Sequence, residues 1–239
     1  KLAPFDDSAY VALAQCYRNK KDWDKAIETL KQALKVNPRA ATIFFDLGLI
    51  YMEGRKFADA KKSFERAIQI DPGFFEAQYN LAMTHEDLKE INKAEKIYRS
   101  LLKREPTFAP AHLNLGKLLA QKGFIKEAQN HFQQSVGNNG TQADAYYNLA
   151  LLMHEQEKHI QAISYYQKVI ALDPTHAQSY NNLGVLLSKN SNFSESLAAF
   201  TNATRYKPDF ADAFYNLALV HIGQKNVAPA TQALYTVIE

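Results

Sequence analysis

Residues that break or cross-link a chain are scarce in this sequence. Its 239 residues include one cysteine, nine glycines and eight prolines. A single cysteine cannot form an intramolecular disulfide, which is compatible with a reducing compartment. Because glycine and proline are few and apolar residues recur three and four positions apart, the pattern favours helix over strand nearly everywhere. The sequence therefore predicts an all-α protein.

Long apolar runs and a strong net charge are absent too. No run approaches the roughly 18 apolar residues needed to cross a bilayer, so we expect no membrane insertion. The formal net charge is only +3, which gives no reason to expect nucleic acid as a partner. With 46% hydrophobic residues, the chain is long enough for one large domain or two small ones.

Patterns of catalytic or metal-binding residues are also missing. The stretch HEQEKH begins like the zinc motif H-E-x-x-H, which needs its second histidine four residues after the first. That position is Lys158, and His159 follows one residue too late to share the face of His154. No glycine-rich phosphate loop and no G-x-S-x-G motif occurs. We therefore expect no catalytic residues, no cofactor and no metal, and hence no enzyme activity in this chain.

What the sequence does contain is a strict internal repeat. Prolines recur at one phase, 34 residues apart or at twice that spacing: Pro38, Pro72, Pro106, Pro174 and Pro208. Gly140 stands midway in the longer gap, where a proline is due, so the register passes through the chain without an insertion.

Small residues recur with the same period. One set marks a first helix: Ala14, Gly48, Ala82, Gly116, Ala150, Gly184 and Ala218. A second set follows in each unit: Ala26, Ala60, Ala94, Ala128, Ala162, Ser196 and Ala230. Small side chains let two helices approach closely, so each unit is predicted to be a helical hairpin. Cys16 falls at a phase filled elsewhere by apolar residues such as Ile50 and Leu152, which predicts a core position.

The pattern resembles the tetratricopeptide repeat, which has an aromatic residue, Leu-Gly and Tyr in helix A, and Ala, Phe and Pro in helix B. Repeat 2 carries it in full: Phe44, Leu47, Gly48, Tyr51, Ala60, Phe64 and Pro72. The resemblance covers essentially the whole chain and implies a right-handed superhelical solenoid of about seven helix-turn-helix repeats in a single domain, residues 1–239. The repeats are 7–40, 41–74, 75–108, 109–142, 143–176, 177–210 and 211–239, the last one truncated.

Two departures bear on how the repeats are joined. Gly137 to Gly140 replace the usual proline-ended turn, which predicts either a looser joint, because glycine permits left-handed backbone, or merely different turn chemistry. Neither end has the polar outer face that terminal repeats normally need. The chain is therefore expected to be a segment of a longer solenoid or to form a homo-oligomer by stacking its ends.

An asparagine recurs at one phase of helix A: Asn80, Asn114, Asn148, Asn182 and Asn216, with Asp46 in its place in repeat 2. Asparagine costs about 0.5 kcal/mol relative to Ala inside a helix, so five at one phase need a reason. In the family, helix A lines the concave groove, and a primary amide offers a donor and an acceptor to a peptide backbone. This asparagine ladder resembles the one in the repeat domain of O-linked N-acetylglucosamine transferase. The alternative is that the asparagines were copied with each repeat, or bond to neighbouring helices.

Aromatic and acidic residues accompany the ladder. The aromatic positions are Phe45, Tyr79, Tyr147 and Tyr215. An acid stands four residues before the asparagine in every second repeat: Glu76, Asp144 and Asp212. Duplication by pairs explains this alternation without a function. If it also serves binding, it favours ligands with Lys or Arg.

We therefore predict a non-catalytic protein–protein interaction scaffold that binds an extended peptide or disordered segment in its concave groove. One alternative is the substrate-recruiting repeat domain of a larger enzyme, such as O-linked N-acetylglucosamine transferase. Another is a self-assembling structural array.

Overall fold

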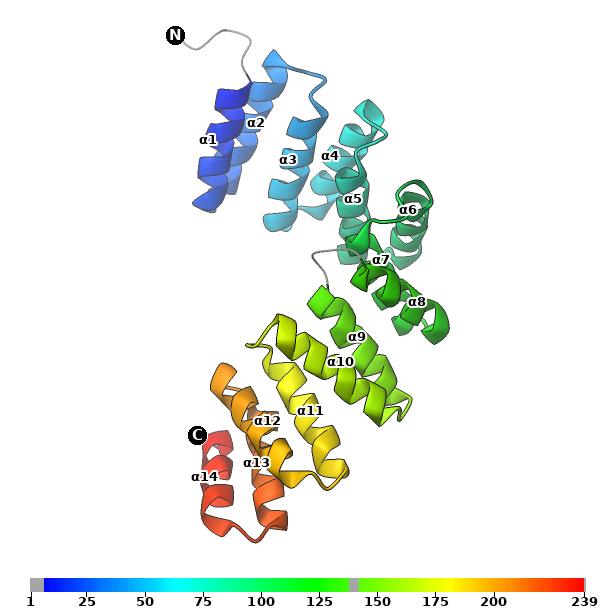
Figure 1. Cartoon of the computed structure of the whole chain (residues 1–239). Helices are drawn as coiled ribbons and strands as arrows, with labels where there is room; N and C mark the ends of the chain where they lie inside the picture. The colour runs from blue at the N-terminus through cyan, green and yellow to red at the C-terminus, as the bar shows by residue number, and fades with distance from the viewer. Residues whose placement is uncertain (1–6, 138–141, 239) are drawn as a thin grey trace. The chain divides into compact units, whose positions relative to one another are not determined.

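The computed structural model describes residues 7–137 and 142–238. Over these residues the chain forms fourteen helices and no strand, which confirms the all-α prediction (Figure 1). The helices are α1 (Ser8–Asn19), α2 (Trp23–Val36), α3 (Ala41–Glu53), α4 (Phe57–Ile70), α5 (Phe75–Asp87), α6 (Ile91–Arg104), α7 (Ala109–Gln121), α8 (Ile125–Val136), α9 (Gln142–Glu155), α10 (His159–Leu172), α11 (Ala177–Lys189), α12 (Phe193–Tyr206), α13 (Ala211–Gly223) and α14 (Val227–Ile238). Odd-numbered helices are called A helices below, and even-numbered ones B helices.

Contacts divide the chain into two compact units, residues 1–111 and 112–239. In the first unit, successive helices pack against each other from the pair α1 and α2 to the pair α5 and α6. In the second, the same holds from α8 to α14. Antiparallel hairpins stacked in order are the packing of a tetratricopeptide-repeat solenoid. The single domain over residues 1–239 stays a prediction, and the predicted joint at Gly137–Gly140 lies outside the described residues except for Gly137, which ends α8.

The turn inside each hairpin places one residue in the left-handed region. Six of these residues are not glycine and have φ between 57° and 62°: Lys21, Arg55, Lys89, Glu157, Ser191 and Lys225. The seventh is Gly123, with φ 82°. Side chains other than glycine adopt this conformation rarely, because Cβ crowds the following carbonyl. The 34-residue period is therefore present in the backbone as well as in the sequence.

A glycine on the A helix makes room for a phenylalanine on the B helix of the same hairpin. A Cβ added to Gly184 would stand 2.8 Å from Cε1 of Phe200, and Gly116 has the same relation to the Phe132 ring. Hairpins with alanine at this phase carry a tyrosine or a leucine instead, as Ala150 with Tyr166 and Ala218 with Leu234 do. The alternation between successive repeats therefore has a packing basis, because the small residue and the ring change together.

The prediction of a core position for Cys16 was wrong, since its side chain is exposed on α1. Ile50, at the same phase, is buried in a cluster with Leu30 of the preceding hairpin. None of the described residues forms a helix before α1 against which Cys16 could pack.

Candidate functional site

The predicted site residues lie on A helices of both units. Those of the first unit are on α3 and α5, those of the second are on α9, α11 and α13, and Asn114 is half-buried on α7. We call the positions of the repeated asparagines and of Asp46 the ladder positions. Their side-chain contacts differ from one hairpin to the next.

Three of the four aromatic residues are part of the packing between hairpins. The Tyr147 ring lies 6.1 Å from that of Tyr166, on the B helix of its own hairpin, and 4.9 Å from that of His176, just before the next A helix. Phe45 and Tyr79 make the equivalent pairs of contacts, with Phe64 and Phe74 and with Tyr98 and Phe108. Tyr215 differs, because 51% of its surface is exposed.

Asn80 and Asn148 bond to their own helices. The Asn80 amide donates to the carbonyl oxygen of Glu76 at 2.8 Å, and the Asn148 amide donates to that of Asp144 at 2.7 Å. Within the described residues, neither amide oxygen accepts a hydrogen bond. Both side chains are half-buried, so each presents a fixed acceptor at the surface of its A helix.

Asn182 and Asn216 bond to neighbouring helices instead. Asn182 donates to the hydroxyl of Tyr166 on α10 at 3.2 Å. Asn216 donates to Oδ1 of Asn181 on α11 at 3.0 Å, and Asn181 donates to Oδ1 of Asn182 at 3.4 Å. The three amides and the hydroxyl form one chain of hydrogen bonds from α13 through α11 to α10. Burial raises the pKa of Tyr166, while its bond with Asn182 acts in the opposite direction.

Asp46 is the one acid at a ladder position. Its carboxyl is half-buried, and burial raises its pKa above the ordinary value, although the positive charge of Arg18 lowers it in part. Arg18 itself is paired with Glu53 through its guanidinium. Asp46 is therefore a carboxylate held in a site that favours its neutral form.

The acids that precede the asparagines lie in the first turns of their helices. Glu76, Asp144 and Asp212 are exposed in α5, α9 and α13, respectively. None of the three forms an ion pair within the described residues. A carboxylate in the first helical turn is stabilised by the helix dipole by about 0.3–1 kcal/mol, so these acids have a structural role even without a ligand.

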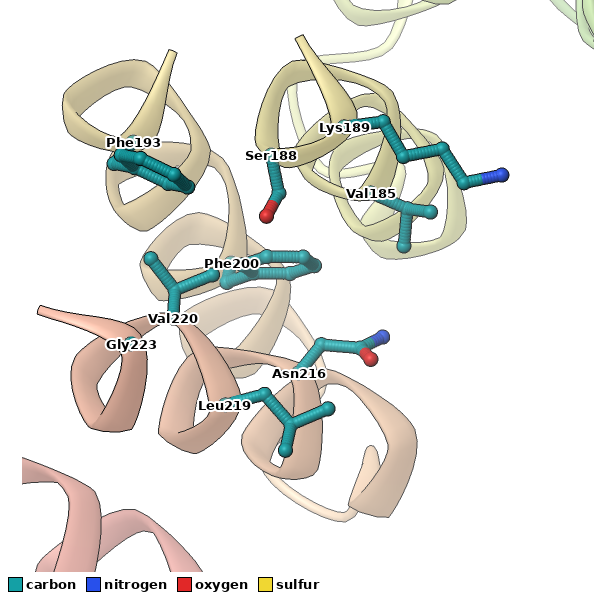
Figure 2. Close-up of a pocket in the computed structure, with 9 residues that line it drawn as sticks. All are labelled: Val185, Ser188, Lys189, Phe193, Phe200, Asn216, Leu219, Val220 and Gly223. Atoms are coloured by element: carbon teal, nitrogen blue, oxygen red, sulfur yellow. The ribbon is translucent and has the colours of Figure 1, made fainter. Parts of the chain in front are cut away.

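A pocket of about 230 Å³ lies where α11, α12 and α13 meet. Its lining residues are Val185, Ser188, Lys189, Phe193, Phe200, Asn216, Leu219, Val220 and Gly223. Figure 2 shows Phe200 in the middle, with Lys189 and the Asn216 amide extending to one side, and Phe193, Val220 and Gly223 on the other. Sequence reasoning missed this pocket, although the glycine at position 223 was a visible signal.

The histidines of the HEQEKH stretch lie at the end of α9 and the start of α10. The rings of His154 and His159 are 6.2 Å apart and roughly perpendicular. Burial lowers the pKa of His154, as do the positive charges of Lys189 and His159, and only Glu155 raises it. No group of three or more His, Cys, Asp or Glu side chains suited to a metal ion lies within the described part of the chain.

Comparison with known families identifies the repeat. Four family profiles, each described as tetratricopeptide repeat, match residues 11–73, 51–115, 143–176 and 165–198. The chain therefore belongs to the tetratricopeptide repeat family. Such repeats are interaction scaffolds that bind protein or peptide partners and are in general not catalytic. Among the described helices, none has the length and apolar character to span a bilayer.

Solved structures share the fold at low sequence identity. A structure of Pseudomonas aeruginosa pilF has a TM-score of 0.74 at 19% identity and covers 81% of this chain and 88% of its own. A tetratricopeptide repeat protein from Parabacteroides merdae has a TM-score of 0.69 at 18% identity, over 98% and 99% of the two chains. A chain of the APC/C hetero-tetramer Cut9–Hcn1 gives 0.69 at 18% identity, over 99% of this chain and 47% of that one. Comparison with curated proteins gives no match.

Proposed function

We propose that this chain is a scaffold that holds an extended peptide or a disordered protein segment against its A helices. The observation that carries the proposal is the hydrogen bonding of the Asn80 and Asn148 side chains. Each uses its amide hydrogen to bond its own helix, and each keeps an amide oxygen that accepts nothing from the described residues. An oxygen fixed in this way is pre-organised to accept an N–H of a peptide backbone, which lowers the entropy lost on binding.

The ladder positions are assigned two different roles. Asn80 and Asn148 are proposed to contact the ligand. Asn182 and Asn216 connect α10, α11 and α13, so we assign them to holding the hairpins of the second unit together. The alternative weighed above, that the asparagines bond to neighbouring helices, thus describes these two residues.

The experiment compares a double variant with a single one. Peptides are first selected from a displayed library of random 12-residue sequences, and the strongest binder is titrated by calorimetry. The variant Asn80→Ala with Asn148→Ala should keep its melting temperature, because alanine favours the helix by about 0.5 kcal/mol at each site. Its affinity should fall about fivefold for a peptide that contacts one of the two asparagines, since a lost hydrogen bond costs about 1 kcal/mol.

Asn182→Ala is the matched control. It should lower the free energy of unfolding by about 1–3 kcal/mol, because it leaves the buried Tyr166 hydroxyl without this partner. Unchanged affinity in the double variant would contradict the assigned contacts. Failure of every peptide in the library to bind would contradict the proposed function itself.

A further inference from the structure

Gly223 breaks a pattern that every other A helix follows. It is the last residue of α13, and the last residues of the other A helices all have polar side chains: Asn19, Glu53, Asp87, Gln121, Glu155 and Lys189. Neither packing nor backbone conformation requires glycine there. A Cβ added to Gly223 meets nothing within 4 Å, and its φ is not positive. Since glycine is less favourable than alanine in a helix, its presence is not explained by the fold.

The missing side chain leaves one side of the α11–α13 pocket open. The walls there are apolar, formed by Phe193 and Val220 with Phe200 in the centre (Figure 2). An apolar cavity of about 150 Å³ holds a benzene ring. The volume of about 230 Å³ is therefore enough for one side chain of the size of leucine or phenylalanine.

The opposite side of the pocket carries a cation. Lys189 is exposed and forms no ion pair within the described residues. Its side chain extends to the same side as the amide of Asn216, a ladder residue (Figure 2). Lys189 ends α11, whereas the exposed acids Asp144 and Asp212 lie in the first turns of their helices. Lys189 thus lies at the opposite end of its A helix from the end at which α9 and α13 carry these acids, and α9 itself ends in Glu155.

We propose that the α11–α13 pocket receives one leucine- or phenylalanine-sized side chain of a bound peptide, with the carboxylate of an adjacent acidic residue at Lys189. The proposal rests on the proposed function in that the occupant belongs to a peptide. It adds a specificity: the ligand has an apolar residue next to Asp or Glu. Lys189 selects the acidic residue by charge, and Gly223 leaves the space for the apolar one.

The test uses a blocked dipeptide, acetyl-Leu-Asp-amide, titrated into the full chain and followed by the NMR amide shifts of Val220 and Gly223. Acetyl-Ala-Asp-amide, which cannot fill the pocket, should leave these signals in place. Acetyl-Leu-Asn-amide, which lacks the charge, should bind about two- to fivefold more weakly, the worth of one exposed ion pair. Equal binding by all three dipeptides would overturn the proposal, as would shifts confined to other residues.

Two variants at one position separate filling of the pocket from a change in folding. Gly223→Gln installs the side chain that Gln121 has at this phase, and it should abolish the shift of Val220. Gly223→Ala should retain it, and both variants should be at least as stable as the parent because the glycine is removed. Undiminished binding to Gly223→Gln would overturn the proposal.

The outcome is separate from that of the peptide-library experiment. If 12-residue peptides bind but the dipeptide shifts nothing, the pocket proposal is wrong and the ladder contacts stand. If the dipeptide shifts the Val220 amide signal but none of the 12-residue peptides binds, the pocket proposal stands and the wider scaffold function is wrong.

Discussion

Asn216 donates a hydrogen bond to Asn181, which lies 35 residues earlier on α11. Asn181 is buried at a phase where four other A helices have an aromatic residue, such as Phe45 or Tyr147. Those rings contact the next hairpin through another ring, as Tyr147 contacts His176. In the sixth repeat an amide pair therefore replaces a ring pair as the link to the following hairpin.

This link should appear as a coupling energy between the two residues. Asn181→Ala should lower the free energy of unfolding by about 1–3 kcal/mol, because it leaves the donor of Asn216 without its acceptor. With Asn216→Ala also present, the total loss should be smaller than the sum of the two single losses by about 1 kcal/mol. Urea unfolding of the four proteins measures the cycle. Strictly additive losses would show that the bond does not contribute.

The pairing of glycine with phenylalanine predicts a compensated swap. Gly184→Ala should destabilise the protein by about 1–3 kcal/mol through overpacking against Phe200, despite the better helix propensity of alanine. Adding Phe200→Leu recreates the pair that the seventh repeat has, Ala218 with Leu234, and should recover part of the loss. Gly223→Ala is the control, because nothing surrounds its added Cβ. If thermal unfolding shows Gly184→Ala to be as stable as Gly223→Ala, the prediction of overpacking against Phe200 is wrong.

Asp46 predicts a stability difference that depends on pH. Its folded-state pKa is raised by burial above the ordinary 3.8, so its contribution to stability is fully present below pH 3.8 and declines as pH rises through the raised value. Asp46→Asn, which places at this site the residue of five other repeats, should therefore be more stable than the parent at pH 7. The advantage should vanish near pH 3.5. The test compares the melting temperatures of the parent and Asp46→Asn at the two pH values. If the variant is still more stable at pH 3.5, the raised pKa of Asp46 is not the cause.

His154 predicts a second pH effect of the opposite sense. Its folded-state pKa lies below 6.5 because of burial, Lys189 and His159, so it contributes stability above pH 6.5 that is lost as pH falls through the lowered value. His154→Gln should make the fall in unfolding free energy between pH 7.5 and 5.5 shallower. Lys189→Gln removes one of the charges and should give an intermediate slope. If the unfolding free energy falls equally steeply with pH in the parent and in His154→Gln, the prediction is wrong.

The exposed acids predict a charge preference in the ligand. Peptides selected on the parent protein should be enriched in Lys or Arg, and their affinity should fall as salt rises. The combined variant Glu76→Gln, Asp144→Asn and Asp212→Asn should lose this enrichment. Glu195→Gln, an exposed acid in the first turn of a B helix, should keep it. Enrichment of Asp and Glu at positions facing the three acids would contradict the prediction.

The repeat was predictable because a period in the sequence imposes a period in the backbone. The proline spacing and the small residues of each hairpin predict two helices in each unit, and the described residues form an all-helical chain in which adjacent helices pack in pairs. The partners of the asparagines were not predictable in the same way. An amide at one phase can bond its own helix or a neighbour, and the choice in α11 and α13 depends on Tyr166 and Asn181. No other repeat has an asparagine at the phase of Asn181. The pocket was not predicted from the sequence because it depends on Gly223 having no side chain.

The left-handed residue in each hairpin turn has a consequence for how such a chain can change in length. Lys89, Gly123 and Glu157 have the same backbone conformation despite their different chemistry. A crossover in the coding sequence between two equivalent turns therefore removes or adds whole 34-residue units, and the rejoined turn needs no conformation that it did not already have. A crossover out of phase by one residue would instead place a helical residue in the left-handed position. The turns thus mark the points at which the chain tolerates recombination.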